Sequence, residues 1–377
     1  MTQSKLGSEH YIDPEIFSRE QSAIFRKLWI FAGLKTLLSE PDAFLTRSIG
    51  GVPVLVQNFA GQIKAFENQC AHRQMPLQFE DYGQRRLACR YHGWVYDSSG
   101  RAKSIPSEHT LYRFSEAESK QLCLREFAVE IVGNLVFVNL DTEPLPIASQ
   151  FTDELRGQLE EVSGYFSAQA IHAHIPGRYN WKLNFENVLD SNHVAYVHPQ
   201  SFQPLLKSAS AVERGSNPVD VVEIDSIESA TLASLSYMST SPFKSQPQLW
   251  HESVDCYGDG ETYTNFFLYP NVNFVSPGGR VFLMQQFDPV AAVQTDVIFS
   301  LVVAQEQKRV HATPAILWGH MKGEKRVLDE DRVLLEALQS SMHVDGRKAT
   351  HGAYEAPLQR VASVYLRLMA SSKSASP

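Results

Sequence analysis

Cysteine and positive charge are scarce in this chain, and long apolar runs are missing. The 377 residues include four cysteines and carry a formal net charge of −8. No apolar run approaches the roughly 18 residues that a membrane-spanning helix requires. The acidic balance argues against nucleic acid or an anionic membrane as a partner, because both select a basic face. The first residues lack the basic and apolar segments of a secretory signal, so we expect a cytoplasmic protein.

Composition places the chain among globular proteins. Apolar residues make up 43% of it and charged residues 20%. Its length favours two or three domains and is sufficient for a sizeable core. We find no internal repeat with a period of about 20 to 50 residues, which argues against a solenoid or a propeller.

Two short pairs of cysteine and histidine are the most informative feature of the sequence. Cys70 and His72 form the first pair, and Cys89 and His92 form the second pair after sixteen intervening residues. Two cysteines and two histidines also make tetrahedral zinc sites, but such sites usually pair like with like. Each pair here mixes one cysteine with one histidine. This favours a Rieske [2Fe-2S] cluster, in which one iron takes both thiolates and the other takes both imidazoles.

With Gly93-Trp94 directly after it, the pattern C-x-H-x16-C-x-x-H resembles the Rieske motif of the ring-hydroxylating oxygenases. One departure is Gln74, which stands where the family commonly has glycine and which bears on loop geometry rather than on ligation. The remaining cysteines, Cys123 and Cys256, are expected to be buried apolar thiols.

A second constellation begins in the segment 180–202, which starts with a helical pattern. Asp190 and His193 are three residues apart and share a helix face, whereas His198 lies about 140° further round an ideal helix. A widened turn or a helix break before Pro199 is needed to bring both histidines to one metal. Spacing alone leaves them as surface or core histidines. After a Rieske motif, however, N-x-x-D-x-x-H-x4-H resembles the start of the family's mononuclear iron site, and Asn187 completes the match.

The third iron ligand must be a carboxylate, because two histidines and one acid on one face of Fe(II) leave positions open for O₂. In the family, a late helix carries this ligand in an E-D-x7-Q pattern, which Glu330, Asp331 and Gln339 fit. We therefore expect Asp331 to be the ligand. Glu330 and Asp329 are its local rivals, and a solvated acidic turn is the structural alternative.

The resemblance covers nearly the whole chain and implies an α+β protein. It implies an N-terminal β-rich Rieske domain and a catalytic domain with a large antiparallel sheet packed by helices, of the helix-grip or START-like type. We expect an N-terminal helical segment at 1–40 that packs on the catalytic domain, the Rieske domain at 41–150, the catalytic domain at 151–370 and a disordered tail at 371–377.

Local patterns predict several elements of this fold. Asp13-Pro14 is typical of a helix start, and apolar spacing extends the predicted helix to near Gly33. Ala60-Gly61 and Gly133-Asn134 indicate hairpin turns in the cluster domain. Strand patterns occupy most of residues 219–304, which predicts the large sheet.

The resemblance also implies a function. The chain is expected to be the oxygenase component of a system in which a reductase, with or without a ferredoxin, supplies electrons from NAD(P)H. Its cofactors are then a [2Fe-2S] cluster and a mononuclear Fe(II), with O₂ as co-substrate. The chain is expected to form a homotrimer in which Asp190 bridges a cluster histidine of one subunit to an iron-ligating histidine of the next.

The expected reaction is hydroxylation or dihydroxylation of a small aromatic or apolar molecule, as in aromatic hydrocarbon catabolism. A Rieske monooxygenase that demethylates its substrate or oxidises an amine is the nearest alternative. An electron carrier with an inactive second domain and a binding module with a structural zinc are the alternatives from other classes.

Overall fold

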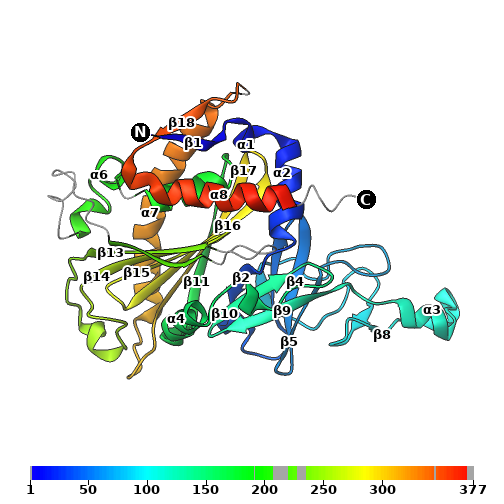
Figure 1. The fold of residues 1–377 in the computed structure, drawn as a ribbon. Coiled ribbons are helices and arrows are strands. Elements are labelled where there is room, and N and C mark those ends of the chain that lie inside the picture. The colour runs from blue at the N-terminus through cyan, green and yellow to red at the C-terminus, as the bar shows by residue number, and fades with distance from the viewer. Residues whose placement is uncertain (1, 191, 207–219, 227–234, 344, 372–377) are drawn as a thin grey trace. The chain divides into compact units, whose positions relative to one another are not determined.

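The structure is a computed structural model, and two compact units make it up (Figure 1). It describes residues 2–190, 192–206, 220–226, 235–343 and 345–371. One unit comprises residues 25–147, and the other comprises residues 1–24 together with 148–377. The predicted domain limits stay predictions, and the predicted tail lies, apart from Ser371, outside the described residues. In the described part of the chain, every helix is too short or too polar to cross a membrane.

Residues 25–147 form a unit around one seven-stranded antiparallel sheet. In spatial order its strands are β2 (Ile30–Leu34), β10 (Leu135–Asn139), β9 (Glu126–Val132), β5 (Gln62–Glu67), β4 (Val52–Phe59), β3 (Ala43–Ile49) and β6 (Tyr82–Gln84). The smaller elements are a 3-10 turn at Lys35–Leu38, the hairpin of β7 (Val95–Tyr96) and β8 (Ala102–Ser104), a π turn at Glu108–Tyr112 and α3 (Glu116–Gln121).

Left-handed turn residues shape the hairpins of this unit. Ala60 and Gly61, with φ of 52° and 100°, connect β4 to β5. Gly133, with φ of 58°, lies in the turn between β9 and β10. Both predicted hairpins are confirmed, and Gly61 and Gly133 suit the positive φ of these turns.

The other unit contains a second seven-stranded antiparallel sheet. In spatial order its strands are β11 (Phe166–Gly177), β17 (Gln294–Ala304), β16 (Val281–Ala291), β15 (Val272–Pro277), β14 (Thr262–Leu268), β13 (Leu235–Pro242) and β12 (Asp220–Ser226). The chain ends also pair, as β1 (Thr2–Gly7) with β18 (Lys348–His351).

The unit that contains this second sheet also contains helices. They are α1 (Glu9–Ile12), α2 (Pro14–Glu20), α4 (Asp153–Gly164), α5 (Lys182–Leu189), α6 (Val194–Val197), α7 (Thr313–Ser340) and α8 (Ala356–Ser371). Short 3-10 or π turns lie at Gln21–Phe25, Ile147–Ser149, Gln203–Leu205, Leu249–Ser253 and Ala353–Glu355.

The long helix α7, orange in Figure 1, packs on the sheet of its unit. Leu317 and Met321 share one helix face, four residues apart, and contact a core that includes Leu283, Phe299 and Leu301 of β16 and β17. All five side chains are buried. The predicted α+β class, with a large antiparallel sheet packed by helices, is confirmed.

The predicted helix from Asp13 to near Gly33 is wrong in its extent. Asp13 caps α2 as predicted, but α2 ends at Glu20 and a π turn follows it to Phe25. Residues of the predicted C-terminal part form β2, in which every side chain is buried. A strand buried on both faces is apolar at every position, so its residues also satisfy the apolar spacing of a helix.

The prediction that both remaining cysteines are buried is also wrong. Cys123 is exposed and Cys256 is half-buried. Cys123 lies in the connection between α3 and β9 rather than in a strand or helix that packs on the core. Connections of this kind run over the surface, which explains the exposure.

A fully buried ion pair holds the N-terminal helix α2 to α5 and α8 within one unit. Lys182 donates to Glu20, and both side chains have no exposed area. Glu20 also accepts from Trp181 Nε1 at 2.8 Å and from the Tyr365 hydroxyl at 2.7 Å. Because several donors satisfy the carboxylate, the cost of burying both charges is offset.

Candidate active site

The two Cys/His pairs lie on two loops of similar geometry. The N–H of Cys70 donates to the carbonyl of Met75, and the N–H of Cys89 donates to the carbonyl of Trp94, both at 2.8 Å. Each loop is therefore closed by the residue five positions after its cysteine. Both cysteines are buried, at 2% and 3% exposure.

Gln74 and Gly93 occupy matching positions in these loops. Each is the fourth residue after its cysteine, and each donates its N–H to that cysteine's carbonyl, at 2.8 Å and 3.0 Å. Both have positive φ, 59° for Gln74 and 73° for Gly93. Glycine adopts this conformation without strain and glutamine rarely does. The departure from the family pattern at Gln74 therefore affects the backbone of the loop.

The four side chains group into a thiol pair and an imidazole pair. The thiols of Cys70 and Cys89 are neighbours, and Nδ1 of His72 lies 3.2 Å from Nδ1 of His92. Tyr96 accepts a hydrogen bond from the backbone, so its hydroxyl proton can be donated to Cys70 Sγ at 3.0 Å. Two thiols on one side and two imidazoles on the other fit the ligands of a Rieske cluster.

The surroundings of this site affect two ionisations. Burial raises the pKa of the Cys70 thiol, against the hydrogen bond from Tyr96. Burial, together with the charges of His92 and Arg73, lowers the pKa of His72. His72 is therefore neutral at pH 7, which is the form that binds metal.

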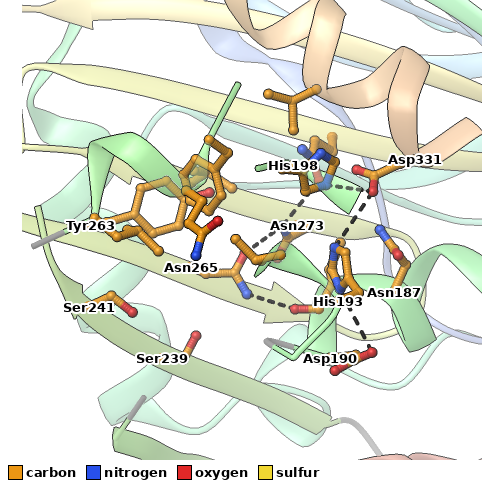
Figure 2. Close-up of a pocket in the computed structure, with 18 of the residues that line it drawn as sticks. Asn187, Asp190, His193, His198, Ser239, Ser241, Tyr263, Asn265, Asn273 and Asp331 are labelled. Atoms are coloured by element: carbon orange, nitrogen blue, oxygen red, sulfur yellow. Dashed lines mark hydrogen bonds and ion pairs between the residues drawn. The ribbon is translucent and has the colours of Figure 1, made fainter. Parts of the chain in front are cut away.

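The second constellation lies where a helix is interrupted. Helix α5 ends at Leu189, Asp190 is its C-cap residue, and α6 begins at Val194. His193 precedes α6 and His198 follows it, so the predicted break before Pro199 is present and both imidazoles point toward α7 (Figure 2). Residue 191 lies outside the described part of the chain.

Asp331 of α7 meets both histidines. Its Oδ1 lies 2.9 Å from His198 Nε2 and 3.6 Å from His193 Nε2. One ligand atom from each of the three residues lies within 4.8 Å of the others. Two imidazoles and one carboxylate in this arrangement fit a mononuclear iron site with open positions.

Glu330 and Asp329, the alternatives to Asp331 as the third ligand, make other contacts. Glu330 Oε2 lies 2.8 Å from His198 Nδ1 and also accepts from the Ser201 hydroxyl. If His198 donates Nδ1–H to Glu330, its Nε2 is free to bind a metal. Asp329 pairs with Lys325 on its own helix. Burial lowers the pKa of His198, but the hydrogen bonds that its ring donates to the Asp331 and Glu330 carboxylates, and their charges, outweigh this effect, so the pKa is raised.

Asp190 lies beside His193. Its Oδ2 is 3.8 Å from His193 Nδ1, which is longer than a hydrogen bond, and its Oδ1 accepts from the N–H of Asn192 at 2.8 Å. His193 Nδ1 is buried. The predicted bridging role of Asp190 and the predicted ligand assignments stay predictions.

A pocket adjoins this site, and strands β13 to β16 supply one wall (Figure 2). Its described lining is rich in uncharged polar side chains: Asn187, Gln203, Ser239, Ser241, Asn265, Asn273 and Gln285. Phe202 and Tyr263 also line it, with ring centroids 4.8 Å apart. No lysine or arginine occurs among the described residues of this lining.

Two family models match the chain. A Rieske [2Fe-2S] domain matches residues 29–117, and the catalytic domain of the ring hydroxylating alpha subunit matches residues 165–371. The second match covers more than half of the chain. The chain belongs to the ring-hydroxylating oxygenase alpha subunits. The two models imply a Rieske cluster and a mononuclear iron that works with O₂.

This alpha subunit has relatives with different reactions. It is 31% identical over 204 residues to the glycine betaine monooxygenase oxygenase subunit of Pseudomonas aeruginosa, a match to 54% of this chain and 46% of that one. It is 32% identical over 213 residues to the large oxygenase component of the naphthalene 1,2-dioxygenase system of Pseudomonas putida, a match to 54% and 47%. The alpha subunit thus spans about half the length of these relatives.

A solved structure agrees with the fold of this alpha subunit. The structure of a quaternary ammonium Rieske monooxygenase matches with a TM-score of 0.77 at 17% identity, over 98% of this chain and 95% of that one. At this identity the likeness shows the fold alone.

Sequence motifs identified the pocket residues near His193 and Asp331 but not those that strands β13 to β16 of the alpha subunit supply. Tyr263 and Asn265 alternate with Thr264 and Phe266 on β14, so a period-two pattern was the available signal. It indicates which side chains share a face, but not that this face lines a pocket.

Proposed function

We propose that this alpha subunit is the terminal oxygenase of a Rieske system, in which Cys70, Cys89 and their two histidine partners hold the cluster. His193, His198 and Asp331 hold the mononuclear iron. The observation that carries the proposal is the meeting of these three residues within 4.8 Å of one another at the wall of a pocket.

When bound, the cluster supplies electrons and the iron activates O₂. The chain's own residues position the ligands. Glu330 accepts from His198 Nδ1 and fixes the tautomer that leaves Nε2 for the metal, and Ser201 in turn donates to Glu330. Asp190 lies beside Nδ1 of His193, the face away from Asp331.

The described lining also contains apolar side chains such as Val194 and Leu206, but its amide and hydroxyl groups support monooxygenation of a polar molecule over dihydroxylation of an aromatic hydrocarbon. A hydrocarbon cannot pair with the amide and hydroxyl groups that it would cover, and burying them unpaired costs free energy. Dihydroxylation is the second candidate, because relatives of both kinds match the chain.

The proposal includes the rest of the system. A reductase, with or without a ferredoxin, delivers electrons from NAD(P)H in the cytoplasm. Three alpha subunits form a trimer, in which Asp190 connects the cluster of one subunit to the iron of its neighbour.

Metal analysis tests the assignment. The purified protein should contain about three irons per chain, two in the cluster and one at the mononuclear site, and should be red-brown. Asp331→Ala should lose one iron and keep the colour, whereas Cys70→Ser should lose the colour. Zinc in a colourless protein would refute the cluster, and full activity of Asp331→Ala would refute the third ligand. Products formed under ¹⁸O₂ then distinguish one labelled oxygen from two.

A further inference from the structure

Three amide side chains form a hydrogen-bonded ladder across the sheet wall of the pocket. The amide ladder comprises Asn265 on β14, Asn273 on β15 and Gln285 on β16. Asn273 Nδ2 donates to Asn265 Oδ1 at 2.7 Å and to Gln285 Oε1 at 3.1 Å. At one end, Asn265 Nδ2 donates to the backbone carbonyl of Val188 on α5 at 3.2 Å. Asn265 and Asn273 are labelled in Figure 2.

The carbonyl of Val188, at one end of the ladder, fixes the direction of these hydrogen bonds. The carbonyl of Val188 can only accept, so the NH₂ group of Asn265 must face it. The oxygen of Asn265 then faces Asn273, which must turn its own NH₂ group toward Asn265. Both hydrogens of that group are used, one on Asn265 and one on Gln285.

This arrangement leaves the oxygen of Asn273 without a donor. Asn273 is 1% exposed, and no described residue donates to its Oδ1, which is itself buried. An amide oxygen can accept two hydrogen bonds. A buried acceptor without any is rare in folded proteins and requires an explanation. Because Asn273 lines the pocket, a bound molecule can provide the missing donor.

The charges of the pocket narrow the choice of that molecule. Besides Asp331 and Asp190, its described lining contains the carboxyl group of Glu324 and no lysine or arginine. Apart from the proposed iron, an anionic molecule would find no positive group in the described lining to pair with, and it would meet the acids. The described lining therefore suits a neutral or cationic molecule.

We propose that the pocket takes a small neutral or cationic molecule with an O–H or N–H group that donates to Oδ1 of Asn273. The inference rests on the proposed function for its site and adds the chemical class of the substrate. Asn273 is then a specificity-determining residue, because a molecule without the donor would cover the buried oxygen and leave it unpaired.

Binding measured by calorimetry on the metal-loaded protein tests this without requiring turnover. The probes are matched pairs: choline and its O-methyl ether, benzyl alcohol and its methyl ether, and N,N-dimethylbenzylamine, which carries an N–H when protonated at neutral pH, and benzyltrimethylammonium, which has none. We expect the donor-bearing member of at least one pair to bind about tenfold tighter or more. Asn273→Leu should bring the two members of that pair to within about twofold.

Gln286→Met is the matched control. Gln286 is a buried amide next to the ladder on β16, but it faces the other side of the sheet and donates to Asp288 at 2.9 Å. Its substitution perturbs β16, which pairs with the strand of Asn273, and should keep the preference for the donor. A preference lost equally in Asn273→Leu and Gln286→Met would show general damage to the sheet and overturn the assignment to Asn273.

A crystal structure of the metal-loaded protein gives an independent reading. A probe oxygen or nitrogen within about 3.2 Å of Asn273 Oδ1 supports the inference, whereas a protein donor, or a water that stays there with the probe bound, overturns it. Equal binding within every pair, or no binding by any donor-bearing probe, also overturns it. Loss of the iron or of oxygen uptake would instead contradict the proposed function, so the two failures are distinguishable.

Discussion

Removal of the Glu330 carboxylate should weaken the mononuclear iron site without removing a ligand. Glu330 lies 2.8 Å from Nδ1 of His198, whose side chain is 2% exposed, so this carboxylate is the acceptor for that ring nitrogen. Loss of such a partner typically costs about 10- to 100-fold in metal affinity, or about 1.4 to 2.7 kcal/mol. Because the Glu330 side chain is itself 27% exposed, water can enter the space it leaves. For Glu330→Ala we therefore expect a loss of about 10- to 30-fold.

Two variants sharpen this prediction. Glu330→Gln keeps an acceptor oxygen and loses the charge, so its loss of affinity should be smaller, about 3- to 10-fold. Asp329→Asn removes the adjacent carboxylate, which pairs with Lys325 and Arg332. It should leave iron affinity unchanged within about twofold, because surface pairs of this kind contribute little.

The assay compares mononuclear iron retained at increasing concentrations of an Fe(II) chelator. Total iron is measured, and cluster iron is subtracted using the visible absorbance, which serves as an internal reference. The reasoning would be refuted if Glu330→Ala retained iron as the unmodified protein does, or if Asp329→Asn lost iron to the same extent.

Three further predictions concern other parts of the structure. Glu20→Gln should lower the free energy of unfolding by about 3 to 5 kcal/mol, because Lys182 stays buried without its counter-charge; urea unfolding measures it, and a loss below about 1 kcal/mol would contradict it. Burial raises the pKa of Glu186 from 4.5 to about 7, so the folded state binds the extra proton and stability falls as pH rises from 4.5 through 7. Glu186→Gln should remove a change of about 3 kcal/mol in the free energy of unfolding across this window. An unchanged dependence of stability on pH would speak against the assignment. Asp190→Asn should keep both metals yet slow electron transfer severely, and cluster oxidation at the normal rate in a single turnover would exclude the bridge.

Residue spacing was informative where ligands come from loops and helix ends. The two Cys/His pairs are close in sequence, so two short loops are enough to bring them together. The 140° between His193 and His198 on an ideal helix predicted a widened turn or a helix break before Pro199, and α6 ends at Val197. Asp331 is distant in sequence, and its choice depended on the family resemblance. In the structure Asp331 lies at Nε2 of His198 and Glu330 lies at Nδ1, and the choice of Asp331 stays a prediction.

The pocket wall was beyond the reach of sequence patterns. Asn265, Asn273 and Gln285 become neighbours only through strand register, which a single sequence does not specify at a distance. The same limit explains the wrong helix prediction at β2. The apolar residues Ile30–Leu34 fit helical and strand spacing equally, and only their pairing with β10 shows that they form a strand.

The amide ladder has a polarity that side-chain substitutions cannot easily reverse. Its first acceptor is the main-chain carbonyl of Val188, which every amino acid supplies. As long as positions 265 and 273 are both asparagine, the ladder presents an oxygen at Asn273, whatever residue occupies position 188. A change of the pocket from hydrogen-bond acceptor to donor therefore requires coordinated replacement of Asn265 and Asn273, and a single substitution produces a broken ladder instead. In an engineering effort or in divergence among relatives, the two positions should change as a pair.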